Sequence, residues 1–127
     1  MDPLLLSWLA GFTAGEGYLG LDSSIRVVWT NTHRPTLEWI QGMVGGTLRV
    51  LSAVQGGRKP RYQLTLHGQR ARDLLKAMSP LLAEKRAQAD LILSYVPGRR
   101  GLKRSQAVLD QLTHIRAQLK ALRHAPS

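Results

Sequence analysis

The residues that could do chemistry lie at the end of the first apolar segment. Residues 3–15 are predicted to form a helix, because apolar side chains recur at helical spacing from Leu5 to Phe12. The pattern ends at Glu16, and Gly17 follows, a residue that can adopt backbone conformations closed to others. Glu16 is therefore expected at a helix C-terminus, where the helix dipole disfavours an anion. A carboxylate held there is often paired with a cation, although an ordinary solvated glutamate would give the same sequence.

Gly15, Gly17 and Gly20 also match the G-x-G-x-x-G spacing of dinucleotide-binding loops. That loop requires a strand before the glycines and a helix after them. Here a helix comes first and a strand is expected to follow, and Glu16 would face the phosphates. We therefore exclude a dinucleotide site.

Net charge is the strongest compositional signal. The 127 residues, enough for one domain, carry +10 at pH 7, and the absence of cysteine excludes disulfides and thiolate metal sites. Residues 1–48 carry −2, residues 49–96 carry +6 and residues 97–127 carry +6. A surface this basic usually binds a polyanion. A membrane partner is disfavoured, because the basic residues are not confined to one amphipathic helix and no apolar run could cross a bilayer.

The remaining elements follow from periodicity and turn residues. Asp2 is expected to cap the first helix, with Pro3 at its first position. Strands are predicted at residues 18–22, 25–32, 47–54 and 61–67, and helices at residues 35–44, 69–78, 81–96 and 103–124. Asp22–Ser24 makes a short turn between the first two strands. The order is α-β-β-α-β-β-α-α-α.

The segment Leu9-Ala10-Gly11-Phe12 with Gly15-Glu16-Gly17 resembles the signature helix of the LAGLIDADG homing endonucleases. It departs from that motif at Thr13 and Ala14, where the family has Ile and Asp. The family's element order also agrees over roughly residues 4–96. The resemblance implies an α+β fold, α-β-β-α-β-β-α, with a four-stranded antiparallel saddle sheet and, here, extra C-terminal helices. Residues 1–96 would form the endonuclease core, and residues 97–127 a basic loop and C-terminal helix of the same domain.

The resemblance implies a Mg²⁺-dependent active site. Glu16 matches the family's metal ligand, and we expect the Gly15 carbonyl to join it. Asn31 matches a polar residue at the end of the second strand, and Lys85 a basic residue near the start of a later helix. The residues alone leave a second interpretation open, in which Asn31 is a turn residue and Lys85 a solvated helix charge.

One copy of the motif implies a homodimer. Small residues on the 3–15 helix let a second helix approach closely, and two copies would pair about a two-fold axis. The expected contacts are Trp8, Ala10, Gly11 and Ala14. Two Glu16 carboxylates would then meet, which is unfavourable unless divalent cations bridge them.

Strand parity predicts a DNA-binding face. If Leu19, Ile25, Val27, Leu48, Val50, Tyr62, Leu64 and Leu66 pack on helices, the opposite face carries Tyr18, Asp22, Ser24, Arg26, Val28, Thr47, Arg49, Leu51, Arg61, Gln63 and Thr65. Arg and Gln suit base edges in the major groove. Arg58, Lys59, Arg99, Arg100, Lys103 and Arg104 are expected to contact phosphates. The first hairpin is short, which reduces the surface available to DNA.

We therefore expect a homodimeric, Mg²⁺-dependent, site-specific double-strand DNA endonuclease that serves intron or intein mobility. The alternative is a non-cleaving nucleic-acid-binding module on the same scaffold, an RNA maturase or a DNA-binding regulator. A third possibility is a protein-interaction domain that docks through residues 103–124, although that helix would more simply cover its own core. No small-molecule substrate and no membrane partner are expected. The N-terminus lacks the basic region of a signal peptide, which predicts a cytoplasmic protein, or an organellar one if it is encoded in an organelle.

Overall fold

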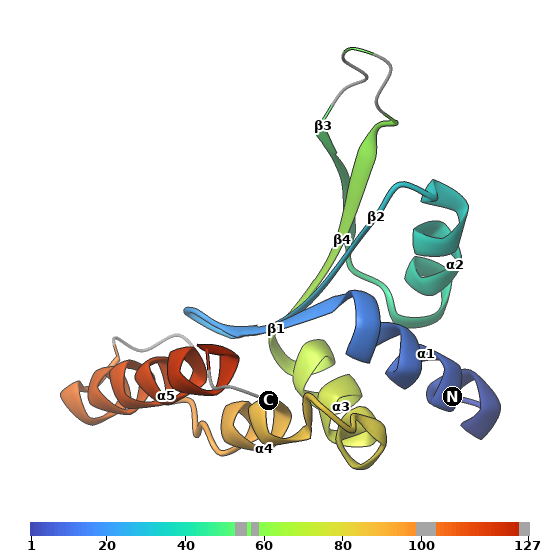
Figure 1. Ribbon diagram of the computed structural model, residues 1–127. Helices are drawn as coiled ribbons and strands as arrows, with labels where there is room; N and C mark the ends of the chain where they lie inside the picture. The colour runs from blue at the N-terminus through green and yellow to red at the C-terminus, as the bar shows by residue number, and fades with distance from the viewer. Residues whose placement is uncertain (53–55, 57–58, 99–103, 125–127) are drawn as a thin grey trace.

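A twisted antiparallel sheet carries helices on its inner face in the computed structural model, which describes residues 1–52, 56, 59–98 and 104–124 (Figure 1). Within these residues the elements are α1 (Pro3–Glu16), β1 (Gly17–Leu21), β2 (Ile25–Asn31), α2 (Arg34–Val44), β3 (Thr47–Ser52), β4 (Arg61–His67), α3 (Gly68–Met78), a 3₁₀ helix (Ser79–Leu81), α4 (Arg86–Leu93) and α5 (Gln106–His124). The strands pair antiparallel in the order β1-β2-β4-β3. The expected α+β fold with a four-stranded antiparallel sheet is confirmed.

The first two helices begin and end as their cap residues dictate. The Asp2 carboxylate accepts the Leu4 N–H at 2.7 Å, and Pro3 is the first helical residue of α1. α2 ends at Gly45 and Gly46, whose φ angles of 82° and 102° are open to glycine. These stops let the chain turn back onto the sheet at β1 and at β3.

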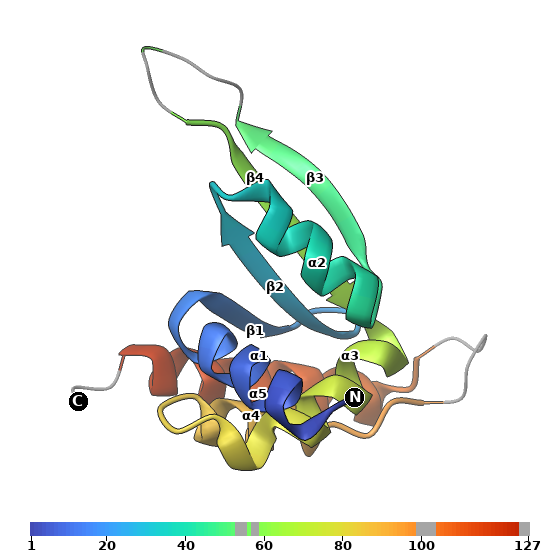
Figure 2. The ribbon, with the colours of Figure 1, turned by 90° about the vertical axis from the view of Figure 1, so that its right-hand side faces the viewer.

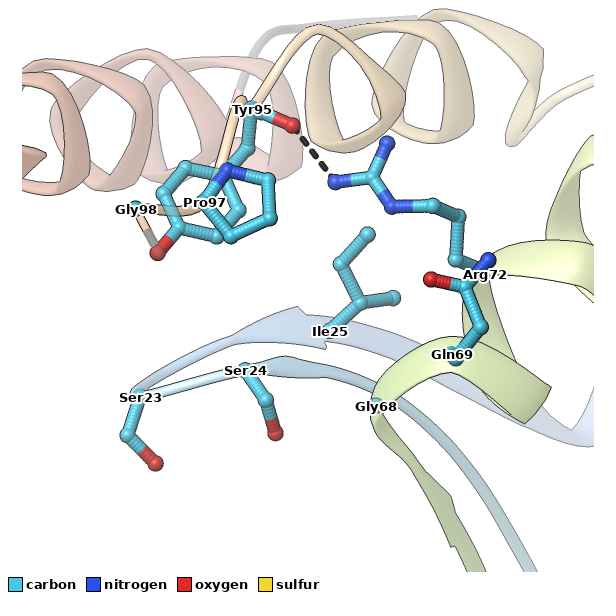
Figure 3. Close-up of a pocket in the computed structure, with 9 residues that line it drawn as sticks. All are labelled: Ser23, Ser24, Ile25, Gly68, Gln69, Arg72, Tyr95, Pro97 and Gly98. Atoms are coloured by element: carbon cyan, nitrogen blue, oxygen red, sulfur yellow. Dashed lines mark hydrogen bonds between the residues drawn. The ribbon is translucent and has the colours of Figure 1, made fainter. Parts of the chain in front are cut away.

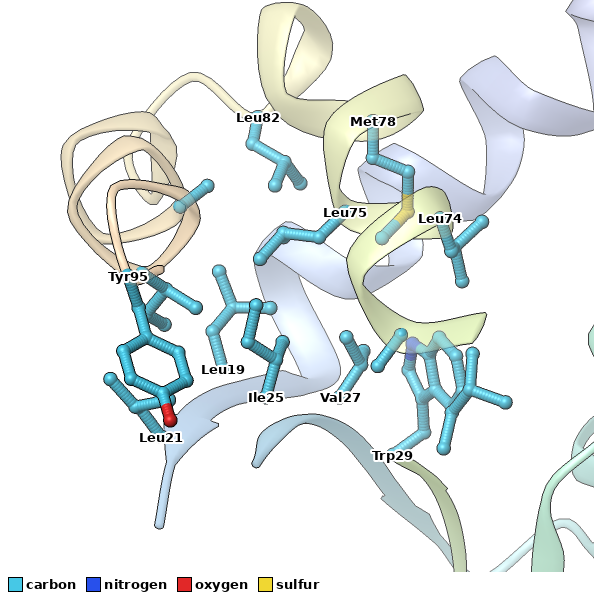
Figure 4. Close-up of a cluster of buried hydrophobic side chains, with 14 of the residues drawn as sticks. Leu19, Leu21, Ile25, Val27, Trp29, Leu74, Leu75, Met78, Leu82 and Tyr95 are labelled. Atoms are coloured by element: carbon cyan, nitrogen blue, oxygen red, sulfur yellow. The ribbon is translucent and has the colours of Figure 1, made fainter. Parts of the chain in front are cut away.

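The inner face of the sheet forms the core. Leu19, Ile25, Val27 and Trp29 lie against α3 and the segment that follows it (Figure 4). α2 lies across β2, β4 and β3 (Figure 2) and buries Leu37 and Ile40. Leu64 and Leu66 of β4 are also buried, as parity predicts.

One inner-face residue is not buried as expected. Val50 is 54% exposed, although it was expected in the core. The β3–β4 hairpin extends past the end of α2 (Figure 1), so no helix covers the sheet at that point. Hydrophobic alternation reports which face a side chain occupies, and burial also requires a partner over that face.

Two predicted helices are shorter than expected. In place of one helix over residues 81–96, the chain forms the 3₁₀ helix at Pro80 and then α4 from Arg86. The Ser79 hydroxyl bonds the Asp90 carboxylate at 2.7 Å and ties these two pieces together. The last helix starts at Gln106 instead of residue 103, because the Ser105 hydroxyl caps it by accepting the Val108 N–H.

α5 contacts the β1 edge of the sheet. Its buried stripe, Val108, Leu112, Ile115 and Leu119, joins the same core cluster as the sheet. Arg116 Nε donates to the Leu21 carbonyl at 3.0 Å, and the Arg123 guanidinium donates to the Leu19 carbonyl. β1 is an edge strand, and exposed edge carbonyls invite pairing with another chain. These arginines therefore occupy acceptors that a further strand would otherwise use.

One buried hydrogen bond fixes α1 on the sheet. Thr13 is fully buried, and its hydroxyl accepts the Trp29 indole N–H at 2.9 Å while donating to the Leu9 carbonyl at 2.6 Å. Trp29 is itself fully buried on β2. Thr13, one of the two residues at which the α1 segment departs from the motif it resembles, therefore satisfies a polar atom of the core.

We predict that Thr13→Val destabilises the protein by about 1–3 kcal/mol, because the buried Trp29 N–H loses its acceptor. Urea unfolding followed by tryptophan fluorescence measures the change. Thr113→Val is the matched control, since Thr113 is exposed and its hydroxyl bonds only the Leu109 carbonyl four residues back. Equal shifts of the two midpoints would show that the indole bond contributes nothing.

Candidate functional site

Glu16 stands at the rim of a polar hollow between α1 and the sheet. The hollow has a volume of about 540 Å³ and is lined by Gly15, Glu16, Gly17, Thr30, Asn31, Thr32 and Arg61. The Glu16 side chain is exposed and forms none of the ion pairs found in the described residues. Its carboxylate is therefore free to meet a ligand from solvent.

Gly17 is required for a reason other than the one expected. Its backbone is ordinary extended chain, with φ −95° and ψ 157°. A Cβ atom there would lie 2.7 Å from the Thr13 carbonyl oxygen. The glycine therefore permits a close approach between the end of α1 and the start of β1, and this contact brings Glu16 to the edge of the sheet.

Asn31 borders the same hollow and also ends β2. Its side-chain oxygen accepts the His33 backbone N–H at 2.8 Å, which is a turn contact between β2 and α2. Its register partner is Tyr62, so it belongs to the inner-face parity of the strand. Thr30 and Thr32, which sequence analysis did not select, have the opposite parity and line the hollow as well. The strict alternation of the strand was the signal that could have identified them.

Lys85 contacts the backbone at the α1 terminus and is not among the residues that line the hollow. Its ammonium donates to the Thr13 carbonyl at 3.1 Å and to the Gly17 carbonyl. Burial lowers the pKa of the Lys85 ammonium, and the nearby carboxylates of Glu84 and Glu16 oppose this shift. A cation at a helix C-terminus also stabilises the helix dipole. Lys85 therefore holds the backbone on which Glu16 sits.

The outer face of the sheet carries a polar, basic row of side chains. Across the strands, Tyr18 is opposite Val28, Val28 opposite Thr65, and Thr65 opposite Thr47. A second row joins Thr30, Gln63 and Arg49. Directly opposed residues share a face, so these side chains line one surface. Arg61 follows the same parity two residues before Gln63.

Arg49 and Gln63 form a fixed pair on this face. Arg49 Nε and Nη2 donate to the Gln63 side-chain oxygen at 3.1 and 2.8 Å. The Gln63 amide nitrogen and the remaining Arg49 guanidinium nitrogen take no part in this pairing and can donate to a ligand. Such groups suit base edges, and holding them in place reduces the entropy lost on binding.

Val28 does not fit the expected DNA-contact set. It lies on the outer face, but only 6% of it is exposed, between its register partners Tyr18 and Thr65. Val28 therefore packs beneath its neighbours and offers little surface to a ligand.

Tyr18 is flanked by two arginines at the outer end of this face. The Arg26 guanidinium carbon lies 5.7 Å from the Tyr18 ring centre, and that of Arg123 lies 4.6 Å away. Asp22 pairs with Arg26 at 3.0 Å. A Cβ at Gly20 would lie 2.8 Å from the Tyr18 ring, so the glycine makes room for this cluster. Sequence analysis did not anticipate Arg123, because it lies 105 residues from Tyr18 in the chain.

The basic residues that were expected to contact phosphates differ in where they lie. Lys59 is exposed just before β4. Arg104 donates to the Ser23 carbonyl at the β1–β2 turn, so it stabilises the fold. Arg58, Arg99, Arg100 and Lys103 lie outside the described residues.

A second hollow, of about 560 Å³, lies at the opposite end of β2. Ser23, Ser24 and Ile25 line it together with α3 and the segment after α4 (Figure 3). Its arginine, Arg72, donates to the backbone carbonyls of Leu93 and Tyr95. Because that cation already serves the fold, the hollow that contains Glu16 is the better candidate site.

The outward side of α1 is apolar and uncovered. Leu4 is 80% exposed, and Trp8, at 41%, stacks on Phe12 and meets Trp39 of α2 edge-on. Cβ atoms at Gly11 and Gly15 would meet nothing within 4 Å. Ala10, expected at a dimer contact, is instead fully buried in the core of its own subunit. It occupies the inward face of α1 and has no surface to offer a partner.

Within the described residues no group of three or more His, Cys, Asp or Glu side chains is placed to hold a metal ion. One subunit therefore offers a single carboxylate at the hollow, with the Gly15 carbonyl beside it in the chain. Both are oxygen donors, the kind that Mg²⁺ prefers. In the same part of the chain, no helix is long and apolar enough to cross a membrane.

No family model and no curated protein matches this sequence. Solved structures do. The homing endonuclease I-CvuI, in complex with its target in the presence of calcium, is 20% identical with a TM-score of 0.58, and 97% of each chain is covered. A second I-CvuI structure, with the I-CreI target DNA not cleaved in the presence of magnesium, is 23% identical with a TM-score of 0.59 at the same coverage.

The archaeal intron-encoded homing endonuclease I-Vdi141I, complexed with DNA, is 14% identical with a TM-score of 0.63 and covers 100% of this chain and 89% of its own. At these identities the likeness concerns the fold. The chain has the fold of the homing endonucleases, as the resemblance of the α1 segment implied.

We predict that Lys85→Met lowers the free energy of unfolding by about 1–2 kcal/mol, because two carbonyls at the end of α1 lose a charged donor. Methionine preserves most of the apolar stem. Thermal unfolding measures the change, and Lys76→Met, at an exposed lysine in the last turn of α3, is the control. A loss no larger than that of the control would show that Lys85 does not support the α1 terminus.

Proposed function

We propose that this chain is a LAGLIDADG-type homing endonuclease that acts as a homodimer and cleaves double-stranded DNA at specific sites with a divalent metal. The observation that carries the proposal is the position of Glu16. Its exposed carboxylate borders a polar hollow that opens beside the basic outer face of the sheet. An acid for chemistry and a surface for a polyanion are thus adjacent.

The sheet would bind the DNA. Arg49 and Gln63 would read base edges, while Lys59 and the Tyr18–Arg26 cluster would contact the backbone near the two ends of the sheet. Binding would depend steeply on salt, because phosphate contacts release counterions. The similar structures support this use of the fold, because I-CvuI is in complex with its target and I-Vdi141I is complexed with DNA.

Glu16 and the Gly15 carbonyl would hold Mg²⁺. Bound there, the ion would supply Lewis acidity at the scissile phosphate and ease deprotonation of the attacking water. Hydrolysis joins the water oxygen to phosphorus and releases one ester oxygen as a hydroxyl. Asn31 would orient the water network at the rim of the hollow. Lys85 would act through the backbone, by fixing the strand–helix junction that carries Glu16.

A second subunit would complete the site. A helix that is apolar on all sides is normally buried on all sides, yet the outward face of α1 is exposed at Leu4 and Trp8. Gly11 and Gly15 weaken the helix by about 1 kcal/mol each relative to alanine, and nothing in the described residues requires their lack of a side chain. Close packing against a second α1 would give these glycines a reason and would bring two Glu16 carboxylates together.

A non-cleaving nucleic-acid-binding module is the second candidate. The observation in its favour is that the Lys85 ammonium is already bonded to two carbonyls and does not reach into the hollow. Docking of a partner protein through α5 has less support, because the apolar stripe of α5 is buried in its own subunit.

We predict that Glu16→Gln slows cleavage roughly a hundredfold or more and leaves DNA binding intact, because one metal ligand and its charge are lost. The wild-type protein is incubated with a randomised double-stranded DNA library, with Mg²⁺ or with EDTA, and the new ends are sequenced. Selected sites are then cleaved under single-turnover conditions. Glu38→Gln, at an exposed acid on α2, is the control.

Two outcomes would contradict the nuclease. The first is that the wild-type protein makes no metal-dependent cuts but retains DNA or RNA in a salt-sensitive way. This result would favour the binding module. Equal cleavage by the wild-type protein and Glu16→Gln would remove Glu16 from the active site.

We also predict that Gly11→Leu converts a dimer to a monomer of equal or greater intrinsic stability. The leucine would block close approach of a second α1, whereas within the subunit it enters open space and improves helix propensity. Analytical ultracentrifugation measures the mass. Gly42→Leu is the matched control, because Gly42 is also an exposed helical glycine with open space at its Cβ. A Gly11→Leu protein that sediments as a dimer would place the interface elsewhere.

A further inference from the structure

Arg61 shares the hollow with Glu16 and Asn31, at the first position of β4. Parity had placed it with the residues that read bases or contact DNA along the sheet. In three dimensions it stands apart from that row, because it is the arginine whose side chain lines the hollow. It lies where the outer face of the sheet meets the end of α1.

Two neighbouring cations are already committed to other contacts. The Lys85 ammonium donates to the Thr13 and Gly17 carbonyls and does not line the hollow. Arg49 is bonded to Gln63, two register pairs farther along the sheet. Arg61 is exposed and takes part in none of the ion pairs or side-chain hydrogen bonds found in the described residues. Its guanidinium can therefore turn toward a ligand in the hollow.

We propose that Arg61 is a catalytic residue, which binds the non-bridging oxygens of the scissile phosphate beside Glu16. This inference rests on the nuclease function proposed above and assigns the phosphate-binding cation within it. When the water oxygen bonds to phosphorus and one ester oxygen leaves as a hydroxyl, negative charge grows on the two non-bridging oxygens. A guanidinium presents paired N–H donors that match those oxygens and stays charged at any working pH.

The surroundings favour this role over simple attraction of DNA. Glu16 and Arg61 line the same hollow, one with a carboxylate and the other with a cation. A phosphate that enters the hollow would therefore be held between a metal-binding carboxylate and a guanidinium. A phosphate contact that serves only positioning would have no need of an acidic neighbour, because the acid repels the phosphate. Thr30 and Thr32 add hydroxyl donors to the same wall.

The test compares Arg61→Ala with Arg70→Ala, which removes an exposed arginine of α3 that does not line the hollow. Both variants are assayed for DNA affinity without Mg²⁺, and for single-turnover cleavage at protein concentrations that saturate the DNA. We expect Arg61→Ala to lower the saturated rate roughly a hundredfold, and Arg70→Ala to leave that rate unchanged. Arg61→Lys should recover part of the rate, because it keeps the charge and loses the paired donors.

The outcomes separate this inference from the function on which it rests. If the wild-type protein makes no metal-dependent cuts, the proposed nuclease is wrong and the question of Arg61 does not arise. If the wild-type protein cleaves and Arg61→Ala at saturation cleaves as fast as Arg70→Ala, the nuclease stands and Arg61 is only a binding residue. Circular dichroism of each variant confirms that the fold is kept.

Discussion

The close junction between the end of α1 and the start of β1 is the constraint on which the rest of the structure depends. Gly17 brings the chain against the Thr13 carbonyl, and no side chain would fit there. The Trp29 indole N–H donates to the Thr13 hydroxyl, and the Lys85 ammonium donates to the Thr13 and Gly17 carbonyls. Three elements therefore meet at one turn of helix. Their meeting point sets where Glu16 stands relative to the sheet.

The basic residues of the chain divide into two groups by what they contact. Arg104, Arg116 and Arg123 donate to the carbonyls of β1 and its turn, and Arg72 donates to carbonyls beyond α4. These cations stabilise the subunit, and those at β1 occupy carbonyls on that edge of the sheet. Arg49, Lys59 and Arg61 lie on or beside the outer face of the sheet and are exposed. Net charge alone therefore overstates the surface available to a polyanion.

The exposed side of α1 contrasts with the rest of the subunit. The long α5 buries a stripe of four apolar residues in the core of its own chain, while Leu109 and Leu122 of the same helix are partly exposed. α1 instead keeps two glycines and two large apolar side chains toward solvent. Exposed glycines in a helix cost stability without helping the subunit. Such a surface is typical of one that is completed by another molecule.

The sequence by itself determined the elements, the sheet parity and the acid at the end of α1, because these follow from local periodicity, caps and turns. Tertiary structure decided what covers each face. Val50 is exposed because the hairpin outruns α2, Ala10 is buried because it faces inward, and Val28 lies beneath its neighbours. It also decided which cation lines the hollow that contains Glu16. Lys85 was the expected residue, yet Arg61 lines the hollow. That outcome depends on distances between residues far apart in the chain, which no local pattern encodes.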